Sequence, residues 1–429
     1  MIQIKRADCN FEREPLVAPF GFKGGYVNEI WQAAARLESE SGQSGVGLAI
    51  QSILWSDAAV FAANLPTAGN ALMYLMTAFA LQKAKKISFE TPTDLLEKLY
   101  PLTLEYGKKV TGNPNLRPTF ALNALVAVDN AAWLLYAREK GITNFDDLVP
   151  DDVKPALTTR HEKLSAIPLI TYGISMSDVV KTLDEGCFFL KVKIGSDPEK
   201  NGDLNKMVEW DKKRLSDIHE AAKNRTTPYT ADGKIPYYLD ANGRYDNKDR
   251  LLRLLDHADK IGALERIMLL EEPFPEDYLA DVSDIPVRLA ADESAHSDVD
   301  AKERIDLGYK AIALKPIAKT LSMSFKILKI TYERKIPCFC ADLTVSPVMI
   351  DWNKNIASRL VPLPGMNIGV LETNGHQNYT RWETLKSFHP CAGAPWTEVK
   401  GGTFTLNKDF YDRSGGIFLR SEHYENLVK

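Results

Sequence analysis

The sequence predicts an α/β fold: a (β/α)7β-type TIM barrel with an N-terminal α+β capping domain that the C-terminal tail completes. From about residue 157 onward, short apolar runs alternate with amphipathic, charged stretches. Parallel strands buried on both faces give such continuous apolar runs, and helices give the stretches between them. Eight runs are found: Ile167–Tyr172, Cys187–Ile194, Tyr237–Asp240, Ile267–Glu271, Val287–Ala291, Ala311–Lys315, Cys338–Ala341 and Asn367–Leu371.

The chain before the barrel changes from β-like to helical texture. Short β-like pieces broken by glycines come first, then a helical stretch over Asn28–Glu38 and a hairpin between Gly42 and Phe61. From Ala68 to Glu139 apolar residues recur at three and four. This spacing predicts helices, with Pro92 at a helix start and Pro101 and Pro114 at helix boundaries.

These changes of texture divide the chain into residues 1–155 (capping domain), 156–378 (barrel) and 379–429, a segment expected to pack back on the capping domain. A doubly wound open sheet is the structural alternative. It would need a glycine-rich loop such as GxGxxG after a strand, and none of the apolar runs is followed by one.

Composition excludes several classes of function. The 429 residues are 45% hydrophobic and 26% charged, with a net charge of −4 and no block of like charges, so nucleic-acid partners are not expected. The five cysteines form no CxxC pair, which fits a reducing cytoplasm. The N-terminus lacks the apolar segment of a signal peptide. The most apolar stretch, about 120 to 137, contains Asn123 and Asp129 and predicts a buried helix rather than a membrane span.

Five charged residues end successive apolar runs, in the order Lys193, Asp240, Glu271, Asp292, Lys315. The carboxyl ends of the strands of a barrel meet at one rim, so these side chains are expected to converge. Three carboxylates without histidine or cysteine suit Mg²⁺, or Mn²⁺, rather than zinc. Acidic residues also cap helices at such junctions. Three in consecutive βα units favour a metal site flanked by two lysines, suited to removing a proton next to a carboxylate.

Neighbouring residues refine this site. Because adjacent residues on a strand face opposite ways, only one of Glu271 and Glu272, and one of Asp292 and Glu293, should face the metal. The other could orient it by a hydrogen bond. Lys191 lies two residues before Lys193 and should share its face, where two like charges would lower each other's pKa.

The segments Lys-Val-Lys-Ile-Gly, Leu-Asp-Ala-Asn-Gly, Glu-Glu-Pro, Ala-Asp-Glu-Ser and Ala-Leu-Lys-Pro, in that order, resemble the enolase superfamily, in particular its muconate lactonizing enzyme subgroup (mandelate racemase/muconate lactonizing enzyme family). Residues 127–142 are similar to the helix that joins the family's capping domain to its barrel. The resemblance covers nearly the whole chain. It implies Asp240, Glu271 and Asp292 as Mg²⁺ ligands and Lys193 and Lys315 as opposed acid/base lysines.

The resemblance also implies substrate contacts. Lys191 would hold the substrate carboxylate or tune Lys193, and Asn242 would contact the substrate or form a turn before Gly243. Dipeptide epimerases of the subgroup carry Asp-x-Asp at the end of the eighth strand; here Glu372-Thr373-Asn374 keeps the spacing but loses one charge. Dipeptide specificity is therefore an open question, with Glu372 and Asn374 as candidate substrate-binding residues.

The expected function is Mg²⁺-dependent removal of the α-proton of a small carboxylate through an enediolate, leading to racemisation or epimerisation. The alternatives are a lyase or cycloisomerase with the same intermediate (muconate cycloisomerase, o-succinylbenzoate synthase or acid-sugar dehydratase) and a non-catalytic binding barrel.

The lining of the substrate pocket is expected to include the loops Phe20–Gly25 and Ser52–Asp57, whose Phe20, Phe22 and Trp55 would shape an apolar pocket. Asp342, Thr344 and His376 are expected to line it as well. The resemblance implies a homo-oligomer, and no membrane partner is expected.

Overall fold

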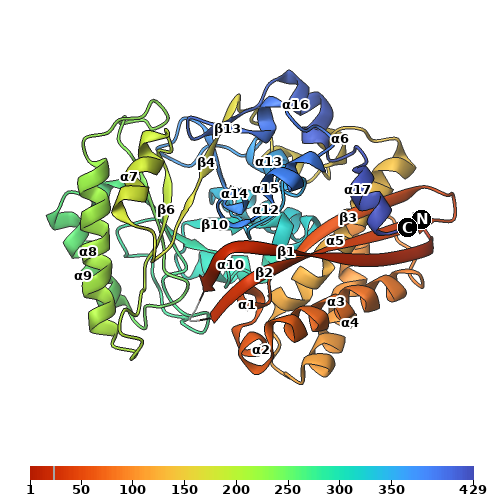
Figure 1. Cartoon of the computed structure of the whole chain (residues 1–429), viewed down its shortest axis with the longest axis horizontal. Helices are drawn as coiled ribbons and strands as arrows, with labels where there is room; N and C mark the ends of the chain where they lie inside the picture. Colours follow the sequence, from red (N-terminus) through yellow and green to blue (C-terminus); the bar gives the residue numbers. More distant parts are fainter. Residues whose placement is uncertain (23–24) are drawn as a thin grey trace.

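A barrel of parallel strands forms the centre of the protein, and the N-terminal sheet with its helices lies against one side of it (Figure 1). The computed structural model describes residues 1–22 and 25–429, with Phe22 described by its backbone alone. The predicted fold class is confirmed. The parallel strands are β4 (Lys163–Ile167), β5 (Leu169–Ile170), β6 (Leu190–Lys193), β7 (Tyr237–Asp240), β8 (Ile267–Glu271), β9 (Leu289–Ala291), β10 (Ala311–Leu314), β11 (Cys338–Cys340) and β12 (Gly369–Glu372).

The barrel closes at Pro168. From β5 the strands follow one another in chain order to β12, which pairs in parallel with β4. β5 pairs with β6, and Pro168 alone separates β4 from β5. Proline has no backbone N–H and interrupts a ladder. Counting β4 and β5 as one interrupted strand, eight strands surround the core.

Helices connect the strands on the outside of the barrel, with one exception. They are α7 (Met176–Asp184), α8 (Leu204–Ala222), α9 (Lys248–Lys260), α10 (Asp298–Asp306), α11 (Pro316–Lys319), α12 (Leu321–Glu333) and α13 (Ile350–Ala357). The connection from β8 to β9 was expected to be helical and contains no helix. Pro273, Pro275 and Pro286 lie in it, and proline inside a helix removes a hydrogen bond and clashes with the preceding turn.

The N-terminal sheet has three antiparallel strands, β1 (Ile4–Phe22), β2 (Gly25–Ser39) and β3 (Ser44–Gln51). The predicted helix over Asn28–Glu38 is therefore wrong. β2 pairs with β1 on one side and β3 on the other, and its Ala33, Ala34 and Ala35 are buried. Tertiary pairing overrides the helical preference of alanine here. The hairpin predicted between Gly42 and Phe61 is formed instead by β2 and β3.

Helices of the capping domain cover this sheet: α1 (Ile53–Ser56), α2 (Ala58–Ala63), α3 (Pro66–Ala84), α4 (Pro92–Thr111), α5 (Pro118–Lys140) and α6 (Phe145–Leu148). Pro92 starts α4 as predicted, whereas Pro101 lies inside it and does not mark a boundary. α5 is long and apolar enough to cross a membrane, but 94% of its most apolar window is buried inside the protein, so this helix serves the core. β3 approaches α5 closely, since a Cβ on Gly47 would lie 2.2 Å from the carbonyl oxygen of Ala127.

The chain after β12 contains α14 (Gly375–Asn378), α15 (Trp382–Ser387), β13 (Val399–Lys400), β14 (Thr403–Thr405), α16 (Lys408–Arg413) and α17 (Glu422–Leu427). It contacts the capping domain through Arg381, whose guanidinium pairs with buried Glu14 at 2.6 Å, and through Leu427, whose carbonyl accepts from Asn10 at 2.9 Å. It also joins the barrel, because β14 pairs antiparallel with β4. The division at residues 155 and 378 stays a prediction.

Candidate active site

A cavity of about 770 Å³, counting its open mouth, lies between the carboxyl ends of the barrel strands and the capping domain. All nine residues predicted for the site line it. They are Lys191, Lys193, Asp240, Asn242, Glu271, Asp292, Lys315, Glu372 and Asn374. Their convergence at one rim follows from the parallel strands, since all but Lys191 stand at or just beyond a strand's carboxyl end, and Lys191 lies two residues before the end of β6.

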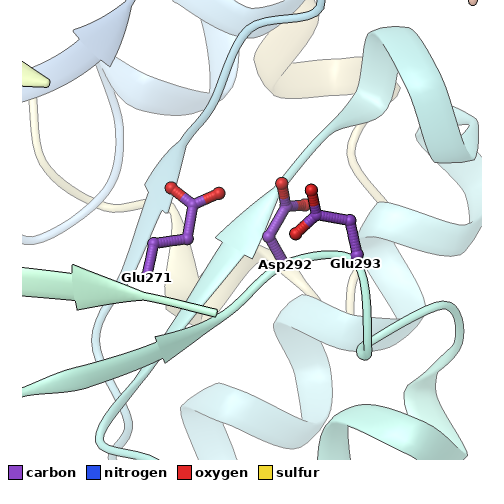
Figure 2. Close-up of side chains that lie close together, drawn as sticks. All are labelled: Glu271, Asp292 and Glu293. Carbon is purple, nitrogen blue, oxygen red and sulfur yellow. The ribbon is translucent and has the colours of Figure 1, made fainter. Parts of the chain in front are cut away.

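Three buried carboxylates gather at the floor of this cavity. Glu271 ends β8, and Asp292 and Glu293 follow β9; in Figure 2 the latter two carboxylates lie side by side and face that of Glu271. One oxygen of each lies within 4.8 Å of the others, and the three residues are 0%, 0% and 2% exposed. Glu271 Oε1 and Glu293 Oε2 accept no hydrogen bond from a described residue. Buried oxygens without donors, converging on one point, fit a divalent cation.

Asp240 lies beside this cluster and is held by lysine. Its Oδ2 is 3.0 Å from the Lys191 Nζ and accepts a hydrogen bond from the Lys193 Nζ at 2.6 Å. Burial opposes ionisation, but these two ammonium groups outweigh it and lower the pKa of Asp240 to about 2. Among the described residues, the three carboxylates that lie close enough together to share a cation are thus those of Glu271, Asp292 and Glu293, whereas the sequence predicts Asp240 in place of Glu293.

The expectation that Glu293 faces away from Asp292 is wrong. β9 ends at Ala291, and the Ala295 N–H donates to the Asp292 carbonyl at 3.1 Å, which closes a turn. The alternation of a strand does not extend into a turn. The sequence predicts that Glu272 orients its neighbour Glu271, but its carboxylate instead accepts the N–H of Asp292 at 2.8 Å, so it positions the residue that follows β9.

The two candidate acid/base lysines stand on opposite sides of the barrel. Lys193 ends β6 and Lys315 follows β10, and β7, β8 and β9 separate them. Strands four apart among eight face each other across a barrel, so the carboxylates at the ends of β7 to β9 lie on the arc between the lysines. Lys315 forms an ion pair with Asp292.

Lys191 lies among three carboxylates, 3.0 Å from Asp240, 2.8 Å from Glu271 and 3.0 Å from Glu372. Burial disfavours its charge, but these neighbours outweigh burial and raise the pKa of Lys191. The pKa of Lys315 is likewise raised, with burial opposed chiefly by Asp292. The lowering of lysine pKa that the sequence predicts beside a bound cation stays a prediction.

Lys319 is a site neighbour that the sequence analysis missed. Its side chain is fully buried, and its Nζ lies 3.2 Å from Asp292 Oδ1 and donates to the Ala295 carbonyl at 3.0 Å. It therefore fixes the turn that carries Asp292. Its position four residues after Lys315 was the available signal, since that spacing places two side chains on one side of a helix.

The other predicted substrate contacts are partly engaged with protein. The Asn242 side chain accepts from Lys193 and donates to Glu293 Oε1 at 3.0 Å, so it joins one lysine to the carboxylate cluster. Asn374 donates weakly to Glu372, at 3.5 Å. His376, which was expected to line the cavity, is exposed, with its ring 6.2 Å from that of Trp382.

The capping domain supplies an apolar wall. Phe20 and Trp55 line the cavity as predicted, together with Val27, Ile30, Ile53, Leu54 and Phe61. Lys23 and Gly24, in the predicted loop Phe20–Gly25, and the side chain of Phe22 lie outside the described residues. An apolar wall opposite a charged floor suits a ligand with an anionic end and an uncharged remainder.

A partly exposed ion pair joins the capping domain to the barrel beside the site. Arg117, which precedes α5, donates to Glu276 in the β8–β9 connection at 2.7 Å, and Glu276 also contacts His296. Burial of Glu276 is outweighed by His296 and Arg117, which lower its pKa from 4.5 to about 2.

Replacing Glu276 by Gln is expected to reduce the free energy of unfolding at pH 7 by about 1 to 2 kcal/mol, since solvent screens a side chain that is 40% exposed. A carboxylate whose pKa is lowered on folding contributes stability above its unfolded pKa and loses it as the pH falls. The difference between wild type and variant should therefore shrink between pH 4.5 and 2, as measured by urea unfolding. Asp306→Asn, in an exposed pair with Lys302, is the control, and an equal effect there would contradict the prediction.

Comparisons with known proteins agree with this geometry. Residues 175–351 match the family model described as enolase C-terminal domain-like. A search of curated proteins gives no match. A mandelate racemase/muconate lactonizing protein from Herpetosiphon aurantiacus is similar in structure, with a TM-score of 0.65 and 18% identity over 94% of this chain and 96% of that one. A dipeptide epimerase from Enterococcus faecalis V583, complexed with Mg and L-Leu-L-Tyr, has a TM-score of 0.63 and 18% identity over 94% and 97%. An N-succinyl Arg/Lys racemase from Bacillus cereus has a TM-score of 0.61 and 16% identity over 88% of each chain.

Proposed function

Because residues 175–351 match the enolase C-terminal domain-like family and the whole chain has the fold of the enolase superfamily, mandelate racemase/muconate lactonizing enzyme type, we propose that the protein is a Mg²⁺-dependent racemase or epimerase of a small carboxylic acid. The observation that carries this proposal is the placement of Lys193 and Lys315 across the barrel from each other, with buried carboxylates between them.

Glu271 and Asp292, together with Glu293 or Asp240, would hold the cation, with Mn²⁺ as a substitute for Mg²⁺. When bound, a divalent cation supplies positive charge that stabilises negative charge on the substrate carboxylate and favours the neutral form of nearby lysines. The four carboxylates differ in what already holds them. Asp240 contacts two lysines, whereas Glu271 and Glu293 each keep one oxygen that has no partner among the residues that the structure describes.

The two lysines would exchange protons with the α-carbon from opposite faces. One neutral amine removes the α-proton, and the opposite ammonium returns a proton to the other face, which inverts the configuration. Lys193 is positioned for this by Asp240 and Asn242, and Lys315 by Asp292. Lys191, between Asp240, Glu271 and Glu372, would contact the substrate carboxylate from the floor.

The test is α-hydrogen exchange with solvent. The enzyme with Mg²⁺ in D₂O is incubated with N-acyl amino acids, dipeptides and sugar acids, and deuterium at the α-carbon is followed by proton NMR. A substrate is expected to gain α-deuterium as its enantiomer or epimer appears. Turnover without α-deuterium would contradict the proposal, and loss of a leaving group or opening of a ring would identify the lyase or cycloisomerase alternative instead.

The structural neighbours guide this choice of compounds. Their names include epimerases of dipeptides and a racemase of N-succinyl amino acids. We further propose a cytoplasmic enzyme that works on a small molecule and assembles as a homo-oligomer, without nucleic-acid or membrane partners. The free state of all five cysteines and the net charge of −4 support the compartment and the lack of a nucleic-acid partner.

A further inference from the structure

Trp55 lies in the wall of the cavity. It belongs to α1, whose four residues are all buried, and it is 5% exposed. The helix is anchored at both ends. The Asn123 side chain accepts the Ser52 N–H at 3.0 Å, and Arg117 donates to the Trp55 carbonyl at 3.5 Å while it also donates to Glu276. Hydrogen bonds therefore hold the backbone of α1 next to the cavity.

The indole ring lies against Lys315. The Lys315 Nζ is 4.6 Å from the centroid of the ring, a cation–π contact. The indole N–H lies in the plane of that ring, so this donor is at the ring edge, next to the lysine that is proposed to exchange protons with the α-carbon. A substrate in the site would therefore have atoms close to the α-carbon within reach of Trp55.

The indole N–H has no acceptor among the described residues, although it is buried. Indole nitrogen can only donate, and buried donors in folded proteins nearly always have an acceptor because an unmade hydrogen bond is costly. The buried Trp133, in contrast, donates to the Ser322 hydroxyl at 2.9 Å. A buried, unpaired donor in the wall of a ligand cavity indicates that the acceptor comes with the ligand.

We propose that the Trp55 N–H donates to a neutral carbonyl oxygen of the substrate, distinct from the substrate carboxylate, and that Trp55 thereby selects acids that carry an acyl or amide carbonyl near the α-carbon. The neighbouring wall residues Ile53 and Leu54 are apolar, and a neutral acceptor is less costly to bury there than a charged one. This inference rests on the proposed function for the place of the carboxylate and for the position of Lys315 beside the α-carbon.

The test compares two achiral acids that differ in one group. In 4-oxopentanoate a carbonyl replaces a methylene of pentanoate. With Mg²⁺ present, 4-oxopentanoate is expected to bind about tenfold more tightly, as for one added hydrogen bond. In proton–nitrogen NMR spectra, the Trp55 indole resonance, identified by its loss in Trp55→Phe, should move downfield with 4-oxopentanoate and not with pentanoate. Trp55→Phe should bind the two acids equally.

Trp133→Phe is the matched control, since it removes a buried indole donor that already has a partner away from the cavity, and it should keep the preference for 4-oxopentanoate. Equal affinity of the wild type for both acids, no binding of either, or a preference that survives in Trp55→Phe would overturn the inference. The ratio of the two wild-type affinities tests the inference even if a variant fails to fold. Because binding is measured without turnover, a preserved preference without α-deuterium exchange would overturn the proposed function and support the role of Trp55.

Discussion

Replacing Lys193 or Lys315 by Met is expected to lower racemisation by about 10³-fold or more in each variant, since a positioned acid or base contributes about 10² to 10⁴-fold and racemisation needs both. The two variants should differ in what they retain. If the lysines face opposite sides of the α-carbon, each variant keeps one of them and still exchanges the α-hydrogen of one enantiomer. Lys193→Met and Lys315→Met should therefore exchange opposite enantiomers.

The measurement is α-deuterium uptake by each pure enantiomer, followed by NMR and chiral chromatography. Lys329→Met is the control, because Lys329 is half-exposed and pairs with Asp152 at the surface, and it should behave as wild type. If one lysine variant still turned over its substrate, the two-lysine mechanism would be wrong, and a lyase or cycloisomerase in which the replaced lysine acts only electrostatically would be favoured.

Replacing Glu271 by Gln is expected to weaken Mg²⁺ binding strongly and to lower kcat by about 10² to 10³-fold, the usual cost of losing one electrostatic stabiliser. Glu271 is fully buried, and its Oε1 has no donor among the described residues. The amide that replaces it keeps the shape but removes the charge that a cation requires. Isothermal titration with Mg²⁺ measures the loss directly, without turnover.

Glu272→Gln is the matched control, at the adjacent position. Glu272 is equally buried, but its carboxylate accepts the Asp292 N–H, and an amide oxygen can still accept that bond. Mg²⁺ affinity should therefore fall far less in this variant than in Glu271→Gln. Similar losses in the two variants would show that charge in the general region, rather than the convergence seen in Figure 2, holds the cation.

Most of the barrel could be predicted from the sequence because the strands are short and apolar, and most of them end at, or just before, a charged residue. That local pattern places Asp240 and Glu271 at the ends of β7 and β8. The pattern fails where the outcome depends on distant pairing. β2 looks helical until its hydrogen bonds to β1 and β3 are known, and the place of Glu293 depends on where β9 ends and the chain turns.

The contacts of the candidate site were harder to predict than its members. Which carboxylate meets which lysine depends on side-chain packing across several strands, and no spacing rule gives it. Lys319 is such a case: its helix α11 could be placed after β10, but its contact with Asp292 required the fold of the turn that follows β9.

The break at Pro168 ties remote positions to catalysis. β4 pairs with β14 of the tail, the Gly402 carbonyl accepts the Ala166 N–H at 2.9 Å, and three residues beyond Ala166 the chain at Leu169 pairs with Lys191. Gly402 lies more than 200 residues from Lys191 along the chain, yet natural variation near it should act on the floor of the candidate site. Shortening the C-terminus as far as β14 would likewise open the barrel wall rather than trim its surface.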